Sequence, residues 1–204
     1  MKDIQRTLYG TPLSGHAHRV ELLLLMLDLP YSYIEAPAEV RRSAEFLQLN
    51  PLGQIPVLID GEQVLCDSNA IMIYLVKQYA PDSGWLPEDP VAAAQVYRWL
   101  SIAAGEVRYG PATARGVKQW AWSGDPDVAR EIAAKLLRFM DGHLTGRRFL
   151  ALDQPTLADL ACYSYIAHAP EGGISLDEYP QVRAWLAEVE ALPHFKPMPD
   201  LPVP

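Results

Sequence analysis

The pattern of apolar and polar positions changes period repeatedly over the first eighty residues. Four short segments have strand-like patterns: residues 4–9, 31–36, 56–59 and 63–66. Three longer segments have helical patterns: residues 14–28, 43–49 and 67–79. Asp60-Gly61 joins the last two strands and predicts a hairpin, because glycine tolerates the positive φ that such turns require. This order predicts a small mixed sheet, parallel at its front and antiparallel at its back, with helices packed on it.

The rest of the chain reads as helical. The pattern at residues 14–28 is apolar on nearly every side, so that first helix is expected to be deeply buried. After a stretch rich in proline and turn-forming residues there is no convincing strand pattern, and helical patterns cover residues 91–109, 112–122, 126–144, 156–167 and 179–192. Pro111 is expected to kink or split a helix, and the proline-rich tail from Pro193 cannot be helical.

These patterns predict two domains of different class. Residues 1–80 form an α/β domain, residues 81–90 a linker, and residues 91–204 an all-helical domain. A cleft between two such domains is a common place for a ligand. The composition agrees with a globular fold, since 50% of the 204 residues are hydrophobic and 21% are charged.

Charge and cysteine content exclude several classes of partner and site. The net charge is −8 and both halves of the chain are acidic, so we expect no nucleic-acid partner. Cys66 and Cys162 lie far apart, which excludes a disulfide framework and any cysteine-based metal spacing. The start of the chain lacks a secretory apolar segment, and the longest apolar stretches, residues 22–27 and 70–76, are too short to span a bilayer. The expected compartment is the cytosol, with no membrane association.

Ser14-Gly15 stands where the first strand ends and the buried helix begins. A helix N-terminus stabilises a nearby anion by about 0.3–1 kcal/mol, and a hydroxyl donating to a charged acceptor adds about 1.5–3 kcal/mol. Lowering a thiol pKa from about 8.5 to near neutrality takes about 2 kcal/mol, so helix end and hydroxyl together suffice. The alternative is that Ser14 only caps its helix.

Two further segments are candidate ligand sites. In residues 50–57 a proline opens a strand, and a cis Ile55–Pro56 bond would turn the backbone N–H and C=O of Ile55 outward toward a peptide-like ligand. The alternative is an ordinary trans proline. At the start of the next helix, Ser68 can hold a carboxylate while Asp67 faces an ammonium, as in the end group of an amino acid. The alternative there is a routine helix cap.

In order and spacing, these motifs resemble the glutathione-binding domain of cytosolic glutathione S-transferases of bacterial type, with a serine-class-like active site. The residues that carry the resemblance are 8–15, 50–58 and 67–71. It continues in the second half at residues 99–115, 156–159 and 179–185, so that nearly the whole chain is covered. The segment 156–159 is similar to the family's capping box.

The resemblance implies a thioredoxin-like domain followed by an all-helical domain, usually in a homodimer. Ser14 would hydrogen-bond the glutathione sulfur and favour its thiolate. Ile55 would pair its backbone with the cysteinyl part ahead of a cis Pro56, with Gln54 nearby. Asp67 and Ser68 would hold the γ-glutamyl end. Glutathione is then a co-substrate, and no metal is expected.

Other residues near these motifs carry open alternatives. Tyr9 is a rival hydroxyl for the sulfur, but Ser14 is preferred, because Tyr9 precedes Gly10 within the predicted strand, where packing explains it. His16 and His18 are two positions apart and would face different ways on a helix, so a shared metal is not expected. The candidates for a second-substrate pocket are Leu13, Tyr109, Arg115, Trp120 and Trp122. The alternative for the three aromatic residues is a place in the core, which is common for aromatic residues at helical spacing. Arg108, Arg115 and Lys118 are spaced to share a helix face that could draw in an anion or simply be solvated.

The resulting hypothesis is a glutathione transferase that conjugates the thiolate to small hydrophobic electrophiles. One alternative is a glutathione-dependent disulfide reductase or peroxidase that works through bound glutathione. A cysteine at position 14 would have favoured a protein-thiol mechanism, and serine stands there instead. The other alternative is a non-catalytic interaction module of the same fold, which would have no need to retain the ligand-binding groups.

Overall fold

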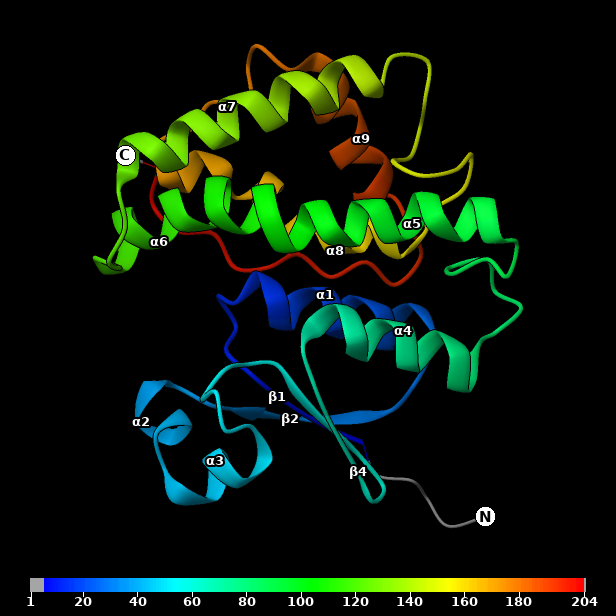
Figure 1. Cartoon of the computed structure of the whole chain (residues 1–204), viewed down its shortest axis with the longest axis vertical. Helices are drawn as coiled ribbons and strands as arrows, with labels where there is room; N and C mark the ends of the chain where they lie inside the picture. Colours follow the sequence, from blue (N-terminus) through cyan, green and yellow to red (C-terminus); the bar gives the residue numbers. More distant parts are fainter. Residues whose placement is uncertain (1–5, 204) are drawn as a thin grey trace. The chain divides into compact units, whose positions relative to one another are not determined.

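A four-stranded mixed sheet forms the centre of the first part of the chain, in a computed structural model that describes residues 6–203 (Figure 1). Its strands are β1 (Arg6–Gly10), β2 (Tyr31–Glu35), β3 (Val57–Asp60) and β4 (Gln63–Cys66), in the order β2-β1-β3-β4. β1 is parallel to β2 and antiparallel to β3, and β3 is antiparallel to β4. The predicted mixed sheet and its hairpin are thus confirmed; residues 4 and 5 of the first predicted strand lie outside the described residues.

Helices α1 (Gly15–Met26) and α4 (Ser68–Tyr79) pack against each other and contact the sheet through β1 and β4. α1 has nine consecutive or nearly consecutive buried positions from Gly15 to Leu24, as its apolar pattern predicts. Two shorter helices, α2 (Ala38–Arg41) and α3 (Ala44–Leu49), follow β2. α3 is predicted, whereas the single turn of α2 is too short to leave a periodic pattern.

A small core cluster joins α3 to the end of the sheet. Ala36, Phe46 and Val57 are buried together, and Tyr9, Leu49, Ile55 and Cys66 pack against them. The aromatic rings of Tyr9 and Phe46 meet edge to face with their centres 6.0 Å apart. This cluster anchors the loop that enters β3, and so it positions the candidate site around Pro56.

The second part of the chain is helical. Its elements are α5 (Pro90–Ile102), η1 (Ala103–Ala112), α6 (Thr113–Trp120), α7 (Pro126–His143), α8 (Leu157–Ala167), η2 (Ala169–Gly172) and α9 (Pro180–Glu190). α8 is buried along nearly its whole length and contacts α5, η1 and α9. It begins with a capping box, as expected from residues 156–159. The Thr156 side chain accepts from the Asp159 N–H, and the Asp159 carboxylate accepts from the Thr156 N–H. Asp159 also accepts hydrogen bonds from the Leu150 N–H and the Trp185 indole.

The predicted helix does not split at Pro111. η1 is a π-helix that contains Pro111, so the chain continues as a helix from α5 into α6. π-Helical turns pair residues five apart, and the missing N–H and the ring of proline are accommodated within this widened stretch. Close packing accompanies it, since a Cβ on Gly110 would lie 2.9 Å from the backbone nitrogen of Ala133 in α7.

The described chain divides into two units. The first runs up to Ser83 and takes back the tail segment Pro193–Pro199; the second holds Gly84–Leu192 and the chain from Asp200 onward. The predicted helical domain covers residues 91–204, whereas the segment Pro193–Pro199 belongs to the first unit, because α1 binds it. Nε2 of His18 donates to the carbonyl oxygen of Lys196 at 2.7 Å, and Nζ of Lys196 pairs with Glu21 at 2.8 Å. Among the helices of residues 6–203, none has the length and apolar character needed to cross a membrane.

Candidate functional site

Ser14 is the N-cap of α1. Its backbone is extended, and its Oγ accepts a hydrogen bond from the Ala17 N–H at 3.3 Å. Ser14 as a residue is half-buried in the first unit. A hydroxyl that accepts from the helix keeps its own proton for an external acceptor. The capping role and the proposed sulfur-binding role of Ser14 are therefore compatible.

The loop before β3 is held by Asn50, which is 5% exposed. Its Nδ2 donates to the Gln54 carbonyl oxygen at 2.8 Å, and its Oδ1 accepts from the Leu52 N–H at 3.1 Å. The Ile55–Pro56 peptide bond that follows is cis, as the resemblance implied. Gln54 is exposed, Ile55 half-buried and Pro56 buried. Asn50 opens the motif, but its role in holding the loop was not predicted from the sequence.

Asp67 and Ser68 lie at the start of α4. Asp67 has a φ of 67°, and one of its carboxylate oxygens caps the helix by accepting from the Asn69 and Ala70 N–H groups at 2.9 and 3.0 Å. The residue is exposed, so the other carboxylate oxygen can face a cation in solution. Ser68 is 4% exposed and lies beneath it in the first turn. The capping alternative for Asp67 is realised, and it uses only one of the two oxygens.

A buried arginine links the N-terminal ends of α1 and α4. Arg19 is 1% exposed, and its Nη1 lies 3.1 Å from Asn69 Oδ1 and 3.4 Å from Ser68 Oγ. Nδ1 of His16 lies 3.4 Å from the same Ser68 oxygen. Arg19 is a site residue that was not predicted from the sequence, and its signal there is an arginine just before the apolar run at residues 22–27. Because a buried cation needs partners, it draws the start of α4 toward α1.

The electrostatics of this region favour an anion. Two helix N-termini, each the start of a twelve-residue helix, are joined by the guanidinium of Arg19. Helix ends carry partial positive charge and N–H groups that can bind a carboxylate or a thiolate. The protein as a whole is acidic, so this is a local feature of the first unit.

The other candidate residues near Ser14 lie in different environments. Tyr9 is half-buried in β1 with its ring against Phe46, which supports packing as its role. His16 contacts Ser68, whereas His18 is buried and bonds the tail at Lys196, so the two imidazoles face different partners. Leu13 is half-buried next to Ser14.

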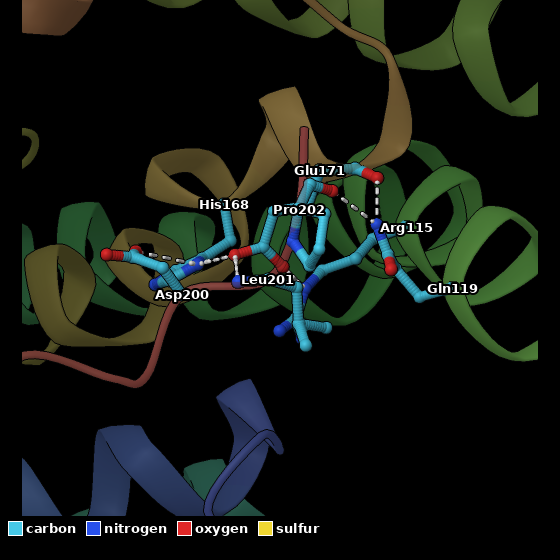
Figure 2. Close-up of polar contacts among 7 residues, drawn as sticks. All are labelled: Arg115, Gln119, His168, Glu171, Asp200, Leu201 and Pro202. Atoms are coloured by element: carbon cyan, nitrogen blue, oxygen red, sulfur yellow. Dashed lines mark hydrogen bonds and ion pairs between the residues drawn. The ribbon is translucent and has the colours of Figure 1, made fainter. Parts of the chain in front are cut away.

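Arg115 is the candidate that the structure corrects. It is 1% exposed, and its Nε donates to Oε2 of Glu171 at 2.5 Å. Figure 2 shows the two side chains within a cluster of residues from α6, η2 and the tail. A buried guanidinium already paired with a carboxylate does not line a pocket or draw in an anionic ligand. Arg115 therefore belongs to the internal structure of the helical unit. Of the three residues predicted to share a basic helix face, Arg108, Arg115 and Lys118, the middle one is buried.

This cluster fastens the end of the chain, and we call Arg115, Gln119, His168, Glu171 and residues 200–202 the tail anchor (Figure 2). Oε1 of Glu171 accepts from His168 Nδ1 at 2.6 Å and from the Leu201 N–H at 2.9 Å. Nε2 of Gln119 donates to the carbonyl oxygens of Glu171 and Pro202. Burial raises the pKa of Glu171, but the hydrogen bonds from His168, Arg115 and Leu201 outweigh it and hold that pKa below its usual value.

The tail anchor also contains a possible set of metal ligands. One ligand atom each of His168, Glu171 and Asp200 lies within 4.8 Å of the others. These groups do not fit a metal ion, because both carboxylate oxygens of Glu171 already accept hydrogen bonds and one of the donors is the Arg115 cation. A second cation beside the guanidinium would be repelled.

The helical unit has an open groove of about 860 Å³ between α5, η1 and α7. It is lined by apolar side chains and a few charged ones: Arg98, Ser101, Ile102, Gly105, Glu106, Tyr109, Ile132, Lys135, Leu136 and Phe139. Tyr109 is 61% exposed at its rim. Trp120 and Trp122 stack on each other outside this groove with ring centres 5.8 Å apart, and both are partly exposed.

Comparison with known proteins gives a consistent result. Two family models match, the N-terminal domain of glutathione S-transferases over residues 8–83 and the C-terminal domain over residues 123–193. Glutathione S-transferase 3 of Zea mays is 32% identical over 97% of this chain and 95% of its own length. A crystal structure of a glutathione S-transferase from Xanthobacter autotrophicus Py2 has a TM-score of 0.87 at 30% identity, covering 95% of this chain and 97% of its own. A glutathione transferase homologue from Drosophila mojavensis with bound glutathione has a TM-score of 0.84 at 28% identity, covering 93% of this chain and 89% of its own.

Proposed function

This chain belongs to the glutathione S-transferase family, and we propose that it joins the sulfur of glutathione to small hydrophobic electrophiles through a serine-type active site. Its first unit has the thioredoxin-like fold of the family and its second unit is the family's helical domain. The observation that carries the proposal is the junction of two helix N-termini through Arg19, Ser68 and His16. It gathers anion-binding groups on the unit that holds Ser14.

Ser14 would stabilise the glutathione thiolate. Its Oγ accepts from the Ala17 N–H, so its proton can be donated to the sulfur. Depressing the thiol pKa to near neutrality needs about 2 kcal/mol, which the helix end and a hydroxyl bonded to a charged acceptor can supply together. The thiol proton leaves to solvent, the sulfur forms a bond to the electrophilic carbon, and the leaving group departs with its electron pair.

The rest of glutathione would bind along the first unit. The backbone N–H and C=O of Ile55 would pair with the cysteinyl part, with Gln54 exposed beside it. The outward oxygen of Asp67 would face the γ-glutamyl ammonium, and the Ser68 hydroxyl would donate to its carboxylate. The bound glutathione in the related Drosophila mojavensis structure supports this as the class of ligand. For the electrophile, Leu13 and the exposed Tyr109 remain candidate contacts.

Replacement of Ser14 separates these roles experimentally. Ser14→Ala should slow conjugation at least about tenfold and return the thiol pKa of bound glutathione to that of free glutathione, measured by the ultraviolet absorbance of the thiolate. Glycine replaces a serine cap at a cost of only a few tenths of a kcal/mol, so Ser14→Gly should lose the same activity with less loss of stability. If Tyr9→Phe abolishes the pKa depression and both Ser14 variants retain it, the assignment of Ser14 is wrong.

A disulfide reductase or peroxidase activity through bound glutathione is the second candidate. The Cys66 thiol does not offer a rival nucleophile. Burial raises its pKa, and the negative charge of the neighbouring Asp67 raises that pKa further, so little thiolate forms. Turnover of a disulfide or peroxide panel with no conjugation of electrophiles would favour this second candidate. Tight binding to immobilised glutathione without turnover of either panel would favour an interaction module.

We also propose a cytoplasmic homodimer. Two observations support it: both cysteines are free thiols, and large apolar side chains such as Leu52, which is 76% exposed, remain on the surface of the single chain. Light scattering coupled to size exclusion should give twice the mass of the chain. A monomeric mass at micromolar concentration would argue against this assembly.

A further inference from the structure

His16 places a titratable ring against a hydroxyl of the proposed glutathione site. It lies in the first turn of α1, and its Nδ1 is 3.4 Å from Oγ of Ser68. Nη1 of Arg19 is 3.4 Å from the same oxygen. Ser68 is 4% exposed, so few water molecules compete for its hydroxyl. Both contacts are long, which leaves the hydroxyl able to change partner when a ligand arrives.

The donors and acceptors around Ser68 restrict where its proton can go. A guanidinium only donates, so Ser68 accepts from Arg19. The hydroxyl proton must then be given to another neighbour. Nδ1 of a neutral His16 with its proton on Nε2 is an acceptor at the right place, whereas Nδ1 of a protonated His16 is a donor.

We propose that His16 is a positioning residue that controls whether Ser68 can donate to the γ-glutamyl carboxylate of glutathione. This inference rests on the proposed function. When His16 is neutral, Ser68 donates to it and is a weaker donor to the ligand. When His16 is protonated, the imidazolium and Arg19 both donate to Ser68, and the hydroxyl proton turns to the carboxylate. Glutathione therefore binds more tightly at lower pH.

Other ionisable groups surround this contact. From α1 these are His18 and Arg19, and from the cap of α4 Asp67. Arg19 donates to Ser68, and Asp67 caps α4 through its carboxylate. His18 is the other imidazole nearby, and it bonds the carbonyl oxygen of Lys196 rather than Ser68. A variant of His16 itself distinguishes the two histidines.

The test uses S-methylglutathione, which keeps the γ-glutamyl group but has no thiol to ionise. Its Kd is measured by calorimetry at about pH 5.5 and about pH 8, on either side of histidine titration. We expect the wild-type protein to bind roughly ten- to hundredfold more tightly at the lower pH, the effect of one added charge-assisted hydrogen bond. His16→Gln can still hydrogen-bond Ser68 but cannot become charged, so its Kd should be the same at both pH values.

Two controls keep the outcomes separate. His194 is exposed and has a φ of 62°, a conformation that asparagine tolerates, so His194→Asn should keep the wild-type pH dependence. Ser68→Ala should weaken binding and lose the pH dependence even with His16 present. A pH dependence that survives in Ser68→Ala or in His16→Gln overturns the inference. Wild-type binding that is equal at both pH values overturns it but leaves the proposed function standing, whereas no binding at either pH overturns both.

Discussion

Replacement of Arg115 by methionine is expected to destabilise the helical unit strongly. The Arg115 side chain is 1% exposed, that of Glu171 is 4% exposed, and their charged atoms lie 2.5 Å apart. Removal of one partner leaves the other charge buried without its counter-ion, at a cost of about 3–5 kcal/mol. Methionine retains much of the apolar stem of arginine, so the loss reports on the charge more than on a cavity.

The unfolding free energy lost in Arg115→Met should depend on pH, because Glu171 is titratable. The folded-state pKa of Glu171 is depressed, so its interactions stabilise the fold above the unfolded pKa and are lost as the pH falls through the folded value. The unfolding free energy of the wild type should therefore decline below about pH 4. In Arg115→Met the carboxyl loses its cation and its pKa rises. Protonation then relieves the buried charge, so the difference from the wild type shrinks as the pH is lowered toward about 5.

Urea unfolding followed by circular dichroism at neutral and mildly acidic pH measures both effects. Arg148→Met is the matched control, because Arg148 pairs with Glu188 at the surface and its side chain is 69% exposed, so little change is expected. Arg115→Met combined with Glu171→Gln should recover part of the lost stability. An Arg115→Met protein as stable as Arg148→Met at neutral pH would refute the reasoning that the tail anchor depends on a buried ion pair.

Two further predictions concern a close helix contact and the loop before β3. Gly110→Ala should lower the unfolding free energy by about 1–3 kcal/mol in thermal melts, because its Cβ would lie 2.9 Å from the Ala133 nitrogen. Gly142→Ala has open space around it and should leave stability unchanged or slightly raised. Asn50→Ala removes two hydrogen bonds across the loop and should raise KM for glutathione severalfold with little change in kcat, whereas the exposed Gln48→Ala should change neither.

The strands of the first unit could be predicted because their signals are local. The observed β3 and β4 differ from the predicted segments by at most one residue, since Asp60-Gly61 marks the turn and apolar runs mark the strands. The buried character of α1 follows equally directly from its apolar pattern. Such signals need no knowledge of what the segment packs against.

The predictions that fail concern residues whose surroundings are set by a distant part of the chain. The helix continues through Pro111 as a π-helix while Gly110 lies against α7. Arg115 is buried because Glu171, 56 positions later, meets it. The tail leaves the helical unit because Lys196 meets Glu21 of α1, which is 175 positions away. Spacing along a helix gives the direction of a side chain but not its partner, so the basic face expected around Arg115 could not be checked from the sequence.

At the candidate site the fold and the ligand share the same polar groups. Ser14 uses a lone pair to cap α1 and keeps its proton for an acceptor outside the helix. Asp67 uses one oxygen to cap α4 and turns the exposed carboxylate toward solvent. A cap and a ligand contact are therefore not competing explanations of such a residue, because each draws on a different atom or electron pair. What the sequence leaves open is the next layer, in which Arg19 and His16 meet Ser68, and it is this layer that determines which way the hydroxyl points.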